Sequence, residues 1–74
     1  MKYSQRMRDL REDHDLSQQE IADKLEIDRS YYGKYERGLH PTPIEIIMKL
    51  CILYDISADY ILGFTNEPKP LPRK

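Results

Sequence analysis

Apolar residues recur at helical spacing along most of the chain, and no stretch alternates between apolar and polar for long enough to indicate a strand. Near the N-terminus, one set follows the spacing of a single helical face: Tyr3, Met7, Leu10 and His14. This set predicts a helix over roughly residues 4–14.

The second predicted helix has a recognisable start. Ser17 and Glu20 match a capping box, in which a hydroxyl and a carboxylate accept hydrogen bonds from backbone N–H groups that lack a partner within the helix. A helix is therefore expected from Gln18 onward. Its buried face carries three apolar residues: Ile21, Ala22 and Leu25.

A third helix is expected after a tight turn. Asp28 is its expected N-cap and Gly38 its expected end. Tyr32 and Tyr35 are expected to be buried. The outward face is polar and carries Arg29, Ser30, Tyr31 and Lys34. A short polar helix that projects from a small domain has a shape suited to the major groove of DNA, so this pattern indicates DNA reading.

Two more helices complete the predicted set. Thr42 is expected to cap the fourth helix, with Pro43 in its first turn and Glu45 completing a second capping box. Six residues of this helix are expected to point inward: Ile44, Ile47, Met48, Leu50, Cys51 and Tyr54. Ser57 is expected to cap a last short helix that ends at Gly63.

Residues 64–74 form a proline-rich segment that we expect to be extended and flexible, because proline removes backbone donors and blocks helix formation. Two interpretations remain open. The segment is either an ordinary frayed terminus or an arm that docks on a partner or on DNA through its basic residues, Lys69, Arg73 and Lys74.

Composition limits the classes of function. A chain of 74 residues with 39% hydrophobic and 34% charged residues suits one small helical domain, and no apolar run is long enough to cross a membrane. Cys51 is the only cysteine, so no internal disulfide can form and a cytoplasmic location is expected. With His14 and His40 it matches no metal-site spacing, and no glycine-rich phosphate loop is present. We therefore expect no metal, no cofactor and no enzymatic activity.

In combination, the motifs resemble the Cro/repressor-type helix-turn-helix family, also called the Xre family. The resemblance covers roughly residues 3–63. Its motifs are Leu16-Ser17-Gln18, Ala22 with Leu25, Tyr35-Glu36-Arg37-Gly38 and Ile56-Ser57-x-x-Tyr60. It implies an all-α fold, a compact five-helix bundle similar to the lambda-repressor DNA-binding domain. Residues 1–63 would form this helix-turn-helix domain and residues 64–74 the tail.

The resemblance also implies which residues contact DNA. Arginine and lysine donate naturally to guanine O6 and N7, and polar side chains near a helix N-terminus hold phosphates. The base-reading positions of the family are occupied here by Arg29, Ser30 and Lys34, with Tyr31 beside them. Phosphate contacts are implied for Gln18, Arg37 and His40.

Two structural expectations also come from the resemblance. Arg11 and Glu36 occupy positions at which family members often form a buried or half-buried ion pair, and the alternative is two unrelated surface charges. Asp15 and Glu26 stand where the family frequently has glycine. Both are therefore expected at positive φ, a conformation that costs a non-glycine residue roughly 1 kcal/mol.

Charge and the family resemblance together lead to two hypotheses about function. The net charge is −1 and the pI about 6.1, less basic than many DNA-binding domains, but basic residues are concentrated between positions 29 and 40. The leading hypothesis is a sequence-specific double-stranded DNA-binding transcriptional regulator that represses as a homodimer on an inverted repeat, pairing in solution or only on DNA. The alternative is a protein-interaction module, such as an antitoxin-like or adaptor subunit.

Two further partner surfaces are expected. The apolar surface for pairing of two copies is expected at Ile46, Ile52, Ile61 and Phe64, and scattered single exposed apolar residues are the alternative. The acidic residues Glu20 and Asp23 leave open a contact with RNA polymerase, since family activators use an acidic surface there.

Overall fold

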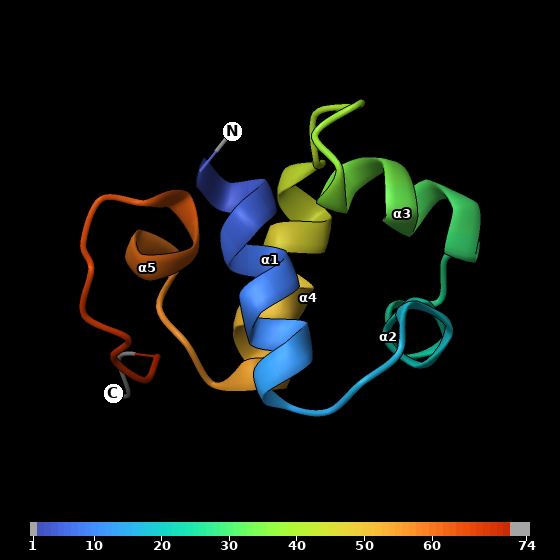
Figure 1. Cartoon of the computed structure of the whole chain (residues 1–74). Coiled ribbons are helices and arrows are strands. Elements are labelled where there is room, and N and C mark those ends of the chain that lie inside the picture. The colour runs from blue at the N-terminus through green and yellow to red at the C-terminus, as the bar shows by residue number, and fades with distance from the viewer. Residues whose placement is uncertain (1, 72–74) are drawn as a thin grey trace.

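The structure is a computed structural model that describes residues 2–71. In that range the chain is all α-helical, with five helices and no strand (Figure 1). The helices are α1 (Lys2–Asp13), α2 (Gln18–Leu25), α3 (Arg29–Glu36), α4 (Ile44–Tyr54) and α5 (Ala58–Leu62). The predicted fold class is confirmed, and no helix among the described residues is long and apolar enough to cross a bilayer.

Local hydrogen bonds explain why α2 begins where it does. The Ser17 hydroxyl accepts from the backbone N–H of Glu20 at 3.0 Å, and the Glu20 carboxylate accepts from the backbone N–H of Ser17 at 3.0 Å. The predicted capping box is therefore confirmed. Asp28 accepts from the backbone N–H of Ser30 at 2.8 Å, so the start of α3 is also as predicted.

The start of α4 differs from the prediction. Pro43 occupies the N-cap position and makes no side-chain cap hydrogen bond. The Thr42 hydroxyl instead lies 3.7 Å from the sulfur of Met7. The predicted second capping box is therefore wrong, because the helix begins at Ile44, one residue later than expected, and Thr42 lies too far before its first turn.

The side of α4 that faces inward is also shifted. Ile44 and Met48 were expected inside but are 63% and 56% exposed, whereas Ile46 is buried. Ile61 of α5 is completely buried as well, so neither it nor Ile46 can contribute to a pairing surface. Of the apolar residues expected on that surface, Ile52 and Phe64 remain exposed, at 71% and 80%.

The core forms where α1 packs against α3 and α5, and α4 against α2 and α5. Six large side chains in it are fully buried: Tyr32, Met7, Ile21, Leu25, Leu50 and Ile61. Tyr35, expected to be buried with Tyr32, is only partly covered. This arrangement leaves α2 and α3 together at one end of the molecule, with α5 at the other (Figure 1).

The segment after α5 passes along the outer side of α5 and returns toward the loop between α4 and α5 (Figure 1). Arg6 of α1 donates to the carbonyl of Thr65 at 3.2 Å and to the side chain of Asn66 at 2.6 Å. The backbone N–H of Ser57 donates to the carbonyl of Lys69 at 2.8 Å, and Leu71 packs against the core. The other basic residues predicted for an arm, Arg73 and Lys74, lie outside the described residues.

Candidate nucleic-acid interface

The third helix presents a polar face from its first residue. Asp28 fixes its start, and the same carboxylate oxygen accepts from both the backbone N–H and the hydroxyl of Ser30, at 2.8 and 2.7 Å. These two bonds hold the pKa of the Asp28 carboxyl below its ordinary value. Arg29, the first residue of α3, is exposed and available to an incoming ligand.

A polar hollow lies between the start of α2 and the outer side of α3. It brings together five of the seven residues predicted for DNA contact: Gln18, Arg29, Ser30, Lys34 and Arg37. The other two, Tyr31 and His40, do not border it. Tyr31 is 56% exposed, with the Lys34 ammonium 5.6 Å from its ring centre, and His40 is exposed in the loop before α4.

Gly33 also lines this hollow, and the sequence analysis did not select it. A Cβ added at Gly33 would lie 3.5 Å from the side-chain oxygen of Gln18, which is ordinary van der Waals contact. The absence of a side chain here deepens the hollow beside the N-terminus of α2. A glycine within an otherwise helical segment was the signal for such a close approach.

The predicted pair between Arg11 and Glu36 is confirmed as a two-pronged ion pair. The Nε and Nη2 atoms of Arg11 each donate to a carboxylate oxygen of Glu36 at 2.9 Å, and Nη1 donates to the carbonyl of Leu16 at 2.8 Å. One guanidinium therefore connects α1, the loop that begins α2, and the end of α3. This fixes the two helices of the motif relative to the rest of the domain.

Burial and hydrogen bonding act in opposite directions on Glu36. Burial is the largest single effect and favours the neutral acid, but the hydrogen bonds and positive charge of Arg11, with smaller contributions from Tyr32 and Gln18, together outweigh it and hold the pKa of the carboxyl below its ordinary value. The Gln18 amide also lies 3.4 Å from the same carboxylate. The negative charge of Glu36 is thus satisfied inside the domain and does not oppose the basic residues of the outer face.

The turn between α2 and α3 has the strained backbone expected from the sequence. Glu26 adopts φ 60°, and Asp15, two residues after the end of α1, adopts φ 55°. Both predictions are confirmed. The left-handed turn at Glu26 is held by the N–H of Ile27, which donates to the carbonyl of Ala22 at 3.0 Å.

A second polar hollow adjoins the first and extends toward α1. It shares Gln18 and Arg37 with the first hollow and adds Gln5 and Arg8. Sequence reasoning missed these last two because their proximity to α2 depends on how α1 packs. Arg8 is exposed and makes only a surface ion pair with Glu12, at 3.6 Å.

The two hollows form a continuous polar surface that suits an anionic ligand. The arginine side chains of Arg8, Arg29 and Arg37 are exposed to solvent. The buried carboxylate of Glu36 is already paired with Arg11, so it does not oppose an anionic ligand. Among the described residues, no group of three or more histidine, cysteine, aspartate or glutamate side chains is placed to hold a metal ion.

Comparison with known proteins identifies close relatives. A model of the helix-turn-helix family matches residues 7–61. The HTH-type transcriptional regulator YobD of Bacillus subtilis is 44% identical over 68 residues, which is 92% of this chain and 61% of YobD. The HTH-type transcriptional regulator ImmR of the same species is 33% identical over 63 residues, 85% of this chain and 50% of ImmR. The chain thus spans about half to three fifths of the length of these curated relatives.

A solved structure has the same arrangement of helices. SinR, a master regulator for biofilm formation solved in complex with DNA, superimposes with a TM-score of 0.73 at 30% identity. The match covers 81% of this chain and 97% of that SinR chain.

Proposed function

Because the chain belongs to the Xre-type helix-turn-helix family, we propose that it is a sequence-specific DNA-binding transcriptional regulator. The observation that carries this proposal is the polar hollow lined by Gln18, Arg29, Ser30, Lys34 and Arg37. It combines the exposed side of a short helix with the N-terminus of a second helix, which is the combination that reads bases and holds phosphate.

Each residue of the hollow has a role in the proposed complex. Arg29 and Lys34 donate to guanine O6 and N7 in the major groove. Gln18 and Arg37 hold phosphates on either side of α3. Ser30 donates its hydroxyl hydrogen to Asp28, so in this geometry it contributes acceptor lone pairs to the groove.

Tyr31 and His40 complete the proposed interface from outside the hollow. Both are exposed, so each can reach a phosphate, and the Tyr31 ring can also contact a thymine methyl. Arg8 joins the phosphate contacts because it borders the adjoining hollow.

The low net charge shapes the expected binding behaviour. With a net charge of −1, the long-range electrostatic attraction to DNA is weak, so nonspecific binding should be weak. Specificity then depends on direct contacts and on pairing of two copies. One recognition helix reads only a few base pairs, so we propose a homodimer on an inverted repeat, with the two helices about 34 Å apart.

We further propose that the regulator is cytoplasmic and represses by covering a promoter. Glu20 and Asp23 are exposed on α2 and remain the candidate contact with RNA polymerase. Transcription from a reporter in which the operator overlaps the promoter distinguishes repression from activation. Activation that depends on Glu20 and Asp23 would show that the proposal of repression by occlusion is wrong.

Replacing either base-reading side chain tests the proposal. An operator is first selected from a random duplex library, and its affinity is then measured for the parent, Arg29→Ala and Lys34→Ala at several salt concentrations. Each substitution should cost about 1–3 kcal/mol on the operator and leave the helical circular dichroism unchanged.

Lys69→Ala is the matched control, because its side chain pairs with Glu67 and lies in the C-terminal segment, outside the polar hollow. It should bind the operator nearly as well as the parent. If Arg29→Ala, Lys34→Ala and Lys69→Ala lose affinity equally, the loss comes from the removed positive charge and not from base reading by α3. If the parent selects no DNA, the alternative role as a protein-interaction module is favoured.

A further inference from the structure

The outer side of α4 carries an uncovered apolar stripe. Ile44, Met48 and Ile52 are spaced four residues apart, so they lie on the same side of the helix, and they are 63%, 56% and 71% exposed. We call these three residues the α4 stripe. A row of large apolar side chains on a small domain marks a contact surface more often than scattered single residues do.

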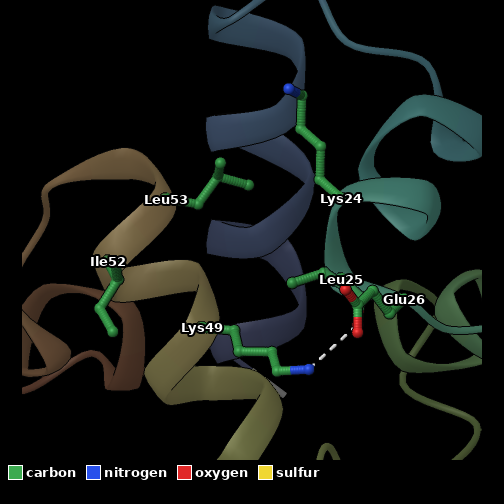
Figure 2. Close-up of a pocket in the computed structure, with 6 residues that line it drawn as sticks. All are labelled: Lys24, Leu25, Glu26, Lys49, Ile52 and Leu53. Carbon is green, nitrogen blue, oxygen red and sulfur yellow. Dashed lines mark hydrogen bonds between the residues drawn. The ribbon is translucent and has the colours of Figure 1, made fainter.

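Grooves lie on both sides of Ile52, which therefore stands as a ridge between them. One groove separates α4 from the end of α2 and is bordered by Lys24, Lys49 and Leu53 (Figure 2). The Lys49 side chain extends from α4 toward the end of α2, and its ammonium donates to the carbonyl of Leu25 at 3.2 Å. The other groove is strongly apolar and contains Ile44, Met48 and Cys51.

The C-terminal segment builds one wall of the apolar groove. Leu71 lines it together with Met48 and Ile52. Arg6 holds the start of this segment with two hydrogen bonds, of 3.2 Å to the carbonyl of Thr65 and 2.6 Å to the side chain of Asn66, and lies 4.1 Å above the ring of Tyr60. The Leu71 side of the groove therefore depends on the docked position of the segment.

We propose that a second copy of this chain occupies these grooves, with the two α4 helices antiparallel across a two-fold axis near Met48. An exposed ridge beside a groove of matching apolar character is complementary to itself, as a two-fold interface requires. In this arrangement Ile44 of one copy lies opposite Ile52 of the other. The Ile52 ridge of each copy enters a groove of the other.

Charge favours a second copy over a partner of one sign. Glu45 and Lys49 are one helical turn apart on α4, so an antiparallel copy brings Glu45 of each chain toward Lys49 of the other. The groove beside α2 likewise carries both signs, through Lys24 and Glu26. A purely acidic or purely basic partner would leave half of these charges opposed.

The size of the surface predicts weak pairing. One helix face and one leucine make an interface smaller than that of a stable dimer, so pairing should be most pronounced when DNA holds two copies side by side. This inference rests on the proposed DNA-binding function for its biological setting. The surface itself can be tested without DNA.

The first experiment compares Ile52→Glu with Phe64→Glu. Both residues are highly exposed, but Phe64 borders neither groove, so it is the matched control. Sedimentation equilibrium at high protein concentration measures self-association, and titrations on one and on two half-sites measure pairing on DNA. Ile52→Glu should weaken two-half-site binding about tenfold and single-half-site binding hardly at all, because a charge placed in an apolar interface opposes pairing.

A charge exchange tests the antiparallel arrangement. Glu45→Lys and Lys49→Glu should each reduce self-association, and the double variant should restore it. Truncation after Glu67 should also reduce it, because the truncated chain lacks Leu71. Circular dichroism verifies that every variant remains folded.

The outcomes separate the two proposals. If Ile52→Glu pairs as well as the parent, or if Phe64→Glu is the variant that fails, the α4 stripe is not the interface. If truncation strengthens self-association, the C-terminal segment competes with the second copy and this arrangement is wrong. Failure of the parent to bind either DNA would refute the DNA-binding function, while sedimentation would still report on the α4 stripe.

Discussion

Within residues 2–71, three non-glycine residues adopt positive φ: Asp15, Glu26 and Asp55. Aspartate tolerates this region better than glutamate, because its short side chain can hydrogen-bond locally. Glu26 therefore carries the largest conformational cost of the three. The turn at Glu26 connects α2 to α3, so its conformation sets the angle between the two helices and the shape of the polar hollow between them.

Replacing Glu26 by glycine should stabilise the domain. Glycine removes the steric cost of φ 60°, so Glu26→Gly should be neutral or should raise the free energy of unfolding by up to about 1 kcal/mol. Lys24→Gly, an exposed position inside α2, is the control and should lower it by about 1 kcal/mol. Urea unfolding measures both, and a loss for Glu26→Gly would mean that its side chain has a role in the turn.

At the scale of the helices, caps decide where each element begins. Two capping boxes were predicted from similar sequence patterns, but only the one at Ser17 forms. A capping hydroxyl acts only when its residue lies directly before the first turn. The proline after Thr42 takes that place in α4, so the cap is lost although the residue types match.

This difference predicts unequal costs for two similar substitutions. Ser17→Ala removes a bond to the backbone N–H of Glu20 and should lower the free energy of unfolding by about 1 kcal/mol. Thr42→Ala loses only a weak contact with the sulfur of Met7, so it should cost less than about 0.5 kcal/mol. Thermal unfolding of both variants makes the comparison, and equal losses would contradict the structure of the α4 terminus.

At the scale of the whole molecule, the Arg11–Glu36 pair joins α1 to the end of α3, across 25 residues of sequence. The side chains are 14% and 3% exposed, so the pair is shielded from water and from salt. Removing the guanidinium would leave a buried carboxylate without its partner, whereas the exposed Arg8–Glu12 pair contributes little. Orientation of the face proposed to read DNA therefore depends on an interaction that lies outside that face.

The same pair should make the free energy of unfolding depend on pH in the acidic range. The pKa of Glu36 is lower in the folded state than its ordinary value of 4.5, so the unfolded chain binds its proton first as pH falls. The stabilisation is complete above the unfolded pKa and is lost as pH falls through the folded pKa. Glu36→Gln should therefore lose stability less steeply than the parent between about pH 5 and pH 3.

Glu12→Gln is the control for this measurement, because its carboxylate is exposed and pairs only with Arg8. It should keep the acid dependence of the parent. Unfolding by urea at a series of pH values gives the slopes. Parallel curves for the parent and Glu36→Gln would show that another carboxyl is responsible.

The sequence by itself determined the helix order and the starts of α2, α3 and α5. These features depend on neighbouring residues, so short-range patterns carry them. The Arg11–Glu36 pair and the five predicted residues that meet in one hollow lie farther apart in the sequence, and they were predicted from motifs shared with the family.

Only the tertiary structure decided which side of α4 is exposed and where the C-terminal segment lies. Apart from Glu45 and Lys49, every residue of α4 is apolar or aromatic. Because apolar residues surround the helix, its hydrophobic pattern cannot specify which of them face the core. The position of Leu71 depends on Arg6 and Ser57, which are distant in sequence. Such contacts form only when the helices pack, and the α4 stripe and its groove follow from them.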